Sequence, residues 1–303
     1  MPSSATAKAA IIGWGLCVLL LLGGCSAVRV GYNQAPTLAW WWLDGYMDFD
    51  AEQAPRVKDA LAQWFAWHRT TQLPDYAELL AAARAQVLQP ATPQQVCRWA
   101  DELRARLSTA LDHGVPLAAG LLPSLKPAQL VHLEQRYRKA NRDFAGDFLQ
   151  QPDARLKAAV KRTVDRAEML YGRLDEPQKK LIAAGVAESP FDPEAWFAER
   201  RALQDQTLQT LSRLTAGGPA RADPASNLAG LQALAARMQR APAGPYRSYQ
   251  QRLQDYNCAF IAQLHNSTTP VQRQAARERL ASWEDDLRAL ALQKPPLRIE
   301  TSP

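Results

Sequence analysis

The chain has 303 residues and a formal net charge of +6 at pH 7, and hydrophobic residues make up 47% of it. This length can bury a substantial core, as one large domain or as two smaller ones. The modest basic excess argues against a nucleic-acid partner, and past residue 22 no apolar run is long enough to span a bilayer.

The first 26 residues have the layout of a secretory signal peptide. Lys8 precedes an apolar run over 11–22, which ends in the small residues Gly23 and Gly24 before Cys25. Such a short apolar run followed by small residues is typical of a cleaved export signal. An uncleaved membrane anchor is the alternative, although two glycines continue a spanning helix poorly.

The ending Gly23-Gly24-Cys25 resembles the lipobox of bacterial lipoproteins. The resemblance implies that residues 1–24 are removed and that Cys25 becomes an acylated N-terminus, for instance with palmitate. Ser26 is similar to the residue found in lipoproteins that are sent to the outer membrane. We therefore expect a protein on the periplasmic face of the cell outer membrane, anchored by lipid.

Residues 25–49 are interpreted as a tether that carries an aromatic cluster of Trp40, Trp41, Trp42 and Tyr46. Three consecutive side chains on a helix spread over about 200° of arc, so they cannot all face one core. Packing in the core, contact with the membrane interface and an aromatic ligand groove are three open interpretations. The cluster is thus a candidate binding surface.

The part of the chain from 50 to 293 has the apolar spacing of helices. Apolar residues recur every three to four positions in the stretches 57–68, 130–148, 156–171, 203–214, 246–264 and 276–290. Prolines fall between such stretches and mark helix boundaries at Pro74, Pro90, Pro116, Pro152, Pro190, Pro242 and Pro295. The pattern predicts an all-α fold, a multi-helix bundle of antiparallel helices without a sheet.

Several predicted helices begin with a capping box, in which a polar cap precedes a glutamine by three positions. The four boxes begin at Asp50, Thr92, Asp175 and Thr269, and a weaker copy begins at Lys126. The cap accepts a free backbone N–H, and the glutamine reaches back to the N–H of the cap residue. The boxes also resemble, loosely, the Thr-x-x-Gln motifs of small helical periplasmic stress chaperones.

The cysteines predict one disulfide. If Cys17 is removed and Cys25 is acylated, Cys97 and Cys258 remain as an even pair in an oxidising compartment. A bridge between them would close a loop of about 160 residues and stabilise the fold by roughly 5 kcal/mol. Two buried free thiols are the alternative.

Two further features bear on organisation. A Gly-, Pro- and Ala-rich segment at 217–226 is a possible boundary within the helical domain, although a Cys97–Cys258 bridge would favour one domain, and 294–303 is expected to be a flexible tail. Acidic residues predominate in 31–90 and basic residues in 126–180. These are ordinary solvated surfaces or a basic face for an anionic envelope polymer.

Residue patterns for catalysis or metal binding are weak. The four histidines are scattered, the acidic segment 44–50 lacks the spacing of a calcium loop, and no phosphate-binding loop occurs. We expect no metal, no cofactor and no catalytic residue. The dipeptide Glu188-Ser189 is similar to the catalytic Glu-Ser of helical lytic transglycosylases, which makes a glycan-cleaving enzyme the least favoured alternative.

The chain as a whole resembles an uncharacterised family of proteobacterial lipoproteins. The resemblance rests on the lipobox and on the strings at 41–46, 63–68, 73–76, 265–269 and 283–287. The resemblance implies a cellular location and a helical fold, but no activity. We expect a lipid-anchored, non-catalytic binding or scaffold protein of the cell envelope, with a chaperone-like stress protein as the alternative. Its partners would be the membrane and an envelope protein or anionic polymer.

Overall fold

The computed structural model describes residues 27–149, 151–216 and 223–293. The predicted signal peptide with Cys25, and the predicted tail 294–303, lie outside these ranges. All regular elements in the described ranges are helical and none is a strand, which confirms the prediction of an all-α fold. Within the same ranges, no helix combines the length and the apolar character needed to cross a membrane.

The helices follow one another with short connections. Their bounds are α2 Ala27–Met47, α3 Gln53–Trp67, the π-helical turn η1 His68–Gln72, α4 Leu73–Gln86, α5 Pro93–Ala119, the 3-10 turn η2 Leu122–Ser124, α6 Pro127–Phe148, α7 Pro152–Tyr171, α8 Glu176–Ala187, α9 Pro193–Thr215, α10 Pro224–Gln239, α11 Pro245–Asn266 and α12 Pro270–Leu292. Most of them carry proline in the first turn, where its missing N–H has no partner to lose.

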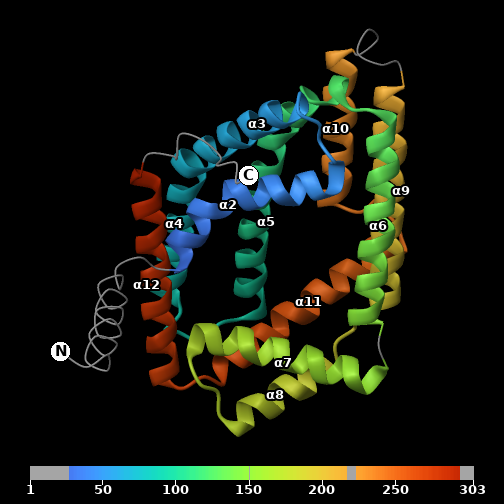
Figure 1. The fold of residues 1–303 in the computed structure, drawn as a ribbon. Coiled ribbons are helices and arrows are strands. Elements are labelled where there is room, and N and C mark those ends of the chain that lie inside the picture. The colour runs from blue at the N-terminus through green and yellow to red at the C-terminus, as the bar shows by residue number, and fades with distance from the viewer. Residues whose placement is uncertain (1–26, 150, 217–222, 294–303) are drawn as a thin grey trace, which may run out of the picture.

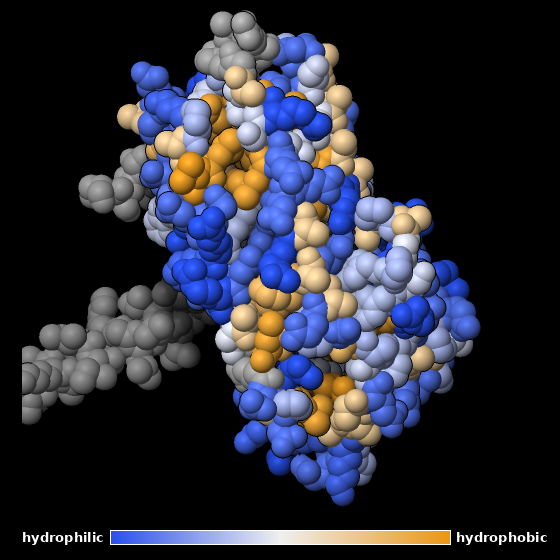
Figure 2. All heavy atoms as spheres, turned by 90° about the vertical axis from the view of Figure 1, so that its right-hand side faces the viewer, coloured by the Kyte–Doolittle hydropathy of each residue, from blue (hydrophilic) through white to orange (hydrophobic). Residues whose placement is uncertain are grey.

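Helices α4 and α12 form the most extensive pair, and they lie side by side in Figure 1. They run antiparallel, since Glu78 pairs with Arg288 and Arg84 with Glu284. On the other side of the molecule, which faces the viewer in Figure 2, α6 packs against α9, and α9 against α10. Helix α5 contacts both α10 and α11 and so lies between these groups.

Two buried clusters hold the helices together. One cluster joins α7, α8, α11 and α12 and includes the fully buried Ile182 and Ala276. The other lies between η2, α6 and α9, around Leu122, Leu133 and Leu211. Burial of such side chains contributes about 1.5–3 kcal/mol each for the larger aliphatic residues.

Three helices that follow capping boxes begin where the sequence predicts, whereas α3 begins only at Gln53, the glutamine of the Asp50 box. Helix α5 starts directly after Thr92, α8 after Asp175 and α12 after Thr269. At α5 the N–H of Gln95 donates to Thr92 Oγ1 at 3.2 Å, and the N–H of Thr92 donates to Gln95 Oε1 at 2.7 Å. Both partners of the box are therefore satisfied.

Four of the box glutamines also bind one another across the fold, and we call the two pairs glutamine junctions. In the N-terminal junction, Gln53 Nε2 donates to Gln129 Oε1 at 3.0 Å and Gln129 Nε2 donates to Gln53 Oε1 at 2.8 Å. Each amide also donates to the carbonyl two positions before the opposite cap residue, which is Ser124 for Gln53 and Asp48 for Gln129. Both side chains are buried and fully hydrogen-bonded.

The C-terminal junction repeats this arrangement. Gln178 Nε2 donates to Gln272 Oε1 at 2.7 Å, and Gln272 Nε2 donates to Gln178 Oε1 at 2.9 Å. The additional acceptors are the carbonyls of Ser267 and Arg173, each again two positions before the opposite cap. The two junctions thus share one hydrogen-bond plan with an approximate two-fold relation inside each.

Two prolines lie within helical segments, contrary to the boundaries predicted at these positions. Pro74 is in the first turn of α4, which continues from α3 through the π-helical turn η1, and α5 extends past Pro116 to Ala119. Pro74 has no N–H to continue the α-helical ladder, and the N–H of Leu73 just before it donates to the carbonyl of His68, five positions back. Pro116 lies in the last turn of α5, where few hydrogen bonds follow it.

Candidate binding groove

Helix α5, the end of α10 and α11 enclose a groove with a volume of about 1030 Å³. Apolar side chains of all three helices line it, among them Leu107 of α5, Met238 of α10 and Ile261 of α11. These three side chains are exposed to solvent. Ligand sites combine apolar walls of this kind with a few polar groups, so the groove is a candidate binding site.

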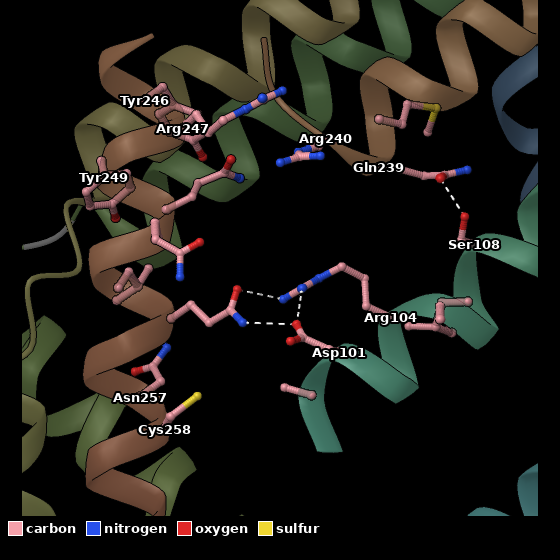
Figure 3. A pocket seen from close by; sticks show the side chains of 18 of the residues that line it. Asp101, Arg104, Ser108, Gln239, Arg240, Tyr246, Arg247, Tyr249, Asn257 and Cys258 are labelled. Carbon is pink, nitrogen blue, oxygen red and sulfur yellow. Dashed lines mark hydrogen bonds and ion pairs between the residues drawn. The ribbon is translucent and has the colours of Figure 1, made fainter. Parts of the chain in front are cut away.

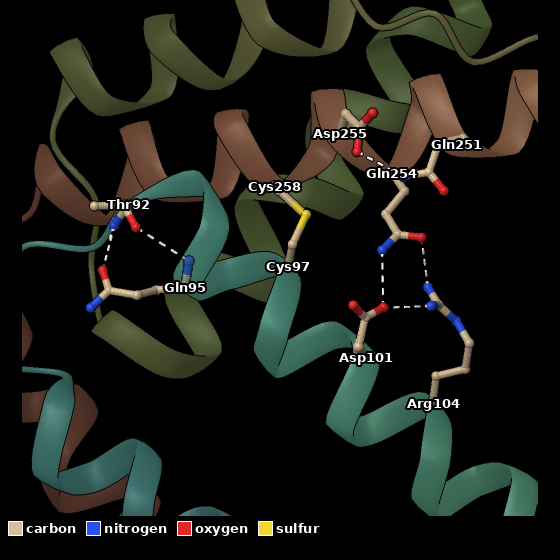
Figure 4. The surroundings of a disulfide bond; sticks show 9 residues. All are labelled: Thr92, Gln95, Cys97, Asp101, Arg104, Gln251, Gln254, Asp255 and Cys258. Atoms are coloured by element: carbon tan, nitrogen blue, oxygen red, sulfur yellow. Dashed lines mark hydrogen bonds and ion pairs between the residues drawn. A yellow bond between two sulfur atoms is a disulfide. The ribbon is translucent and has the colours of Figure 1, made fainter.

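A disulfide closes one end of the groove. Cys97 at the start of α5 is bonded to Cys258 of α11, with their Cα atoms 5.4 Å apart. Figure 4 shows the bridge where the two helices cross. It holds α5 against α11 at this end, so the groove between the two helices has a fixed apex.

A polar triad adjoins the disulfide and links the same two helices. Arg104 donates to Asp101 Oδ1 at 2.6 Å and to Gln254 Oε1 at 2.9 Å, and Gln254 Nε2 donates to Asp101 Oδ1 at 3.2 Å (Figure 3). The triad satisfies the charge of Asp101 and Arg104 within the wall. These exposed contacts set geometry more than they contribute stability.

At the other end, α10 is tied to α5. Ser108 Oγ donates to Gln239 Oε1 at 2.6 Å, and Gln239 Nε2 donates to Asp112 Oδ1 at 2.8 Å. Gln239 is the last residue of α10, so this contact fixes the third side of the groove. The groove is therefore framed by the disulfide and the polar triad at one end and by the contacts of Gln239 with α5 at the other.

The groove carries cations that its own residues do not neutralise. Arg240 is exposed, and Figure 3 places it between Gln239 and Arg247. Among the described residues, the guanidinium of Arg240 has no ion-pair or hydrogen-bond partner. Arg247 donates to the carbonyl of Ala241 and has no acidic partner in the same part of the chain. An anionic group on a ligand would be stabilised at this rim.

The aromatic residues predicted as a binding surface are divided among different environments. Trp40 is buried, its ring stacks on Phe49 at 5.9 Å, and Lys58 Nζ lies 4.6 Å from the indole centroid. Tyr46 packs against the core cluster around Leu122. Trp41 and Trp42 are exposed, and neither lines the groove between α5 and α11.

A buried polar cluster at the π-helical turn is not signalled by any motif in the sequence. Arg69 donates to the carbonyl of Leu290 at 3.0 Å and to Asn33 Oδ1 at 2.8 Å, and its guanidinium lies 4.9 Å from the Tyr32 ring centroid. The Tyr32 hydroxyl is 2.9 Å from Nδ1 of the buried His68. Burial lowers the pKa of His68 to about 4 and raises that of Tyr32 to about 12.

A second Tyr–His pair lies near the C-terminal junction. The Tyr171 hydroxyl is 2.8 Å from His265 Nδ1, and the Nε2 atom is 2.8 Å from the carbonyl of Gln89. Burial lowers the pKa of His265 and raises that of Tyr171 to about 12. The buried His265 thus lies in the last turn of α11, and residues 267–269 connect α11 to α12.

Other residues weighed from sequence lie apart from one another. Glu188 is exposed just after the end of α8, where it lines a pocket of about 520 Å³ together with Tyr256 and Phe260. In the described ranges, no three His, Cys, Asp or Glu side chains gather in a way that could hold a metal ion. The segment 217–226 lies partly outside the described residues, and α10 after it packs on α5 and α9, so a boundary there stays a prediction.

Comparison with known proteins gives one match. A family model described as a family of unknown function, DUF6279, matches residues 45–225. No curated protein and no solved structure matches the chain. The matched segment contains Cys97 and the N-terminal junction, whereas Cys258 and α11 follow it.

Proposed function

We propose that this chain, which belongs to the DUF6279 family of unknown function, is a binding protein of the cell envelope. In this proposal an acylated Cys25 anchors it to the outer membrane on the periplasmic face. The groove between α5, α10 and α11 then binds an apolar segment of an envelope protein that carries an acidic group. The observation that carries the proposal is the framed groove, with its exposed apolar walls and the unneutralised Arg240.

The size and chemistry of the groove favour a polypeptide segment. The two long walls of the groove run along α5 from Cys97 to Leu111 and along α11 from Tyr246 to Cys258. At 1.5 Å per residue each of these walls is roughly 20 Å long, which matches the length of a bound helix of a few turns. Recognition of this kind uses apolar anchors on one face of the incoming helix, with charge at the rim.

A photo-crosslinking side chain at Leu107 tests the groove directly. In cells that export the chain, we expect one dominant cross-linked protein at this position, and a much lower yield when Arg240→Glu is added. The matched control carries the same side chain at Val271, which is exposed at the start of α12. Equal adducts at Leu107 and Val271 would contradict a specific groove partner.

The anchor is tested separately by mass spectrometry of the native protein. We expect an acylated N-terminal Cys25 and the absence of residues 1–24. An intact Met1 with an unmodified Cys25 thiol would contradict the proposed location. Cross-linking at Leu107 would still test the groove in that case, because it does not depend on the membrane anchor.

A chaperone-like role is the second candidate, because several large apolar side chains of α5 are exposed in a row. Leu103, Leu107 and Leu111 recur at every fourth position and lie at the surface. Such a stripe could hold an aggregating client. Suppression of the aggregation of reduced insulin by substoichiometric protein, lost in Leu103→Ser/Leu107→Ser, would favour this role over a single groove partner.

A further inference from the structure

We infer that the outward face of α2 lies on the lipid bilayer and forms a second membrane contact beside the anchor. Four large apolar side chains point away from the protein on this helix. Their exposed fractions are 53% for Val30, 53% for Leu38, 54% for Trp41 and 62% for Trp42. The inference rests on the proposed anchor at Cys25, because that anchor decides which surface covers the helix.

The four side chains share one side of α2. At 100° per residue, Val30, Trp41 and Leu38 fall within an arc of about 80°, and Trp42 extends the arc to about 120°. Helix α2 contacts α3, α6 and α12, and Figure 1 shows it crossing the molecule from the side of α12 toward that of α6. Helix α2 therefore has two apolar sides, one packed against the protein and another exposed.

The outer side of α2 has no charge. From residue 30 to residue 43 the sequence contains no Asp, Glu, Lys, Arg or His. An ordinary solvated helix face carries charged side chains, and most other helices of this chain do so. An uncharged face with two adjacent indoles matches the interfacial zone of a bilayer, where tryptophan is enriched.

The anchor position brings this face to the membrane. Helix α2 begins at Ala27, two residues after Cys25. Two extended residues span at most about 7 Å, so acyl chains on Cys25 would hold the start of α2 within that reach of the headgroups. Insertion of the apolar face would add a second contact with the bilayer to that of the acyl chains.

The neighbouring surface supplies a cation at the far end of the helix. Trp42 stacks with Tyr46 at 4.8 Å, and the Arg136 guanidinium lies 5.4 Å from the Tyr46 ring. Such a group can face lipid phosphates while the indoles enter the interface. The expected pose places α2 parallel to the bilayer plane, and the remainder of the protein extends away from it.

Vesicle partitioning of the chain from residue 25 onward, produced without acylation, tests the inference. This form keeps every described residue. With vesicles of phosphatidylethanolamine and 20% phosphatidylglycerol we expect binding that is largely independent of salt, because the inserted face is uncharged. We expect Trp41→Ser/Trp42→Ser to weaken partitioning about tenfold, which corresponds to a loss of about 1.4 kcal/mol.

The matched control is Met169→Ser/Val271→Ser, in which two apolar residues of similar or greater exposure are changed elsewhere on the surface. This control should partition like the unchanged chain. Circular dichroism and thermal unfolding establish that both double variants fold. Equal weakening by the two double variants, or binding that high salt abolishes, would overturn the inference.

Brominated acyl chains give a second measurement on acylated protein reconstituted in vesicles. We expect quenching of tryptophan fluorescence that disappears in Trp41→Phe/Trp42→Phe and persists in Trp196→Phe. Quenching that is the same in all three proteins would also overturn the inference. An unmodified Cys25 in the native protein would remove the anchor of the proposed function, yet the partitioning of the non-acylated form would still test the contact of α2 with lipid.

Discussion

The two glutamine junctions use the same glutamine contacts but different cap residues. In the C-terminal junction both caps, Asp175 and Thr269, accept the backbone N–H of their box glutamine. In the N-terminal junction only Asp50 does so, and Lys126 instead forms an ion pair with Asp50 at 2.7 Å across the junction. The comparison teaches that the paired amides define the junction, whereas the cap residue can change without loss of the arrangement.

Removing the disulfide that links the two halves of the chain should lower the free energy of unfolding the most. Cys97 lies between the two box glutamines of the N-terminal junction, and Cys258 between those of the C-terminal one, at a separation of 161 residues. We expect Cys97→Ser/Cys258→Ser to lower the free energy of unfolding by about 5 kcal/mol on the loop-entropy model. Urea unfolding measures this loss, and an unchanged midpoint would show that the bridge is dispensable.

Removing one glutamine of a junction should cause the next largest loss in the free energy of unfolding. Gln178→Ala removes both hydrogen bonds between the two amides and leaves the Ser267 carbonyl without its donor, so we expect the free energy of unfolding to fall by about 4 kcal/mol. The matched control is Gln95→Ala, because Gln95 caps its helix without a glutamine partner. For that variant we expect about 1 kcal/mol. Similar losses in the two variants would mean that pairing adds nothing to capping.

Acid should affect the C-terminal junction more than the N-terminal one. Four positions before the caps, the C-terminal junction has Tyr171 and the buried His265, whereas the N-terminal junction has Tyr46 and Leu122. Burial holds the pKa of His265 below its ordinary value. The unfolded chain therefore takes up a proton near pH 6.5 that the folded chain does not, and stability is lost as the pH falls below that value.

His265→Gln should accordingly flatten the fall in unfolding free energy between pH 7 and pH 5. Part of the dependence should remain, because burial also lowers the pKa of His68, to about 4. Urea unfolding at several pH values measures both slopes. An identical slope in the variant and the unchanged chain would contradict the role of His265.

The smallest effect is expected at Lys126, the cap residue that distinguishes the N-terminal junction from the C-terminal one. The Lys126 ammonium holds the pKa of the Asp50 carboxyl below its ordinary value, mainly through their hydrogen bond. Lys126→Thr restores a capping side chain and removes the ammonium, so we expect the Asp50 pKa to rise while the junction persists. Carbon NMR during a pH titration measures this shift. Lys126→Arg should retain the low pKa, and an Asp50 pKa that is the same in all three proteins would contradict the assignment.

Local motifs in the sequence predict the helices but not the contacts between them. The boxes at Thr92, Asp175 and Thr269 place three helix starts because capping is a local interaction over four residues. The pairing of Gln178 with Gln272 depends on the packing of distant helices, and no spacing in the sequence reveals it. The bridge between Cys97 and Cys258 could be inferred because elimination left one pair.

The candidate site could be predicted from the sequence less well than the helices. The three adjacent tryptophans indicated different environments, but only the packing of Trp40 on Phe49 decides which indole is buried. The groove is formed by α5 and α11, which are far apart along the chain, and its residues follow ordinary helical periodicity. Arg69 is buried among polar partners, although as a single arginine in the sequence it gives no signal.

The π-helical turn at His68–Gln72 makes the chain sensitive to length at this point. A π turn accommodates one more residue than an α-helical turn, so it resembles a tolerated one-residue insertion. Deleting one residue there would let an α-helix run through and rotate α4 by about 100°. Leu73 and Ala77 would then leave the interior, and the long pairing with α12 would lose its register. Relatives of this protein should therefore conserve the number of residues between α3 and α4 more strictly than their identity.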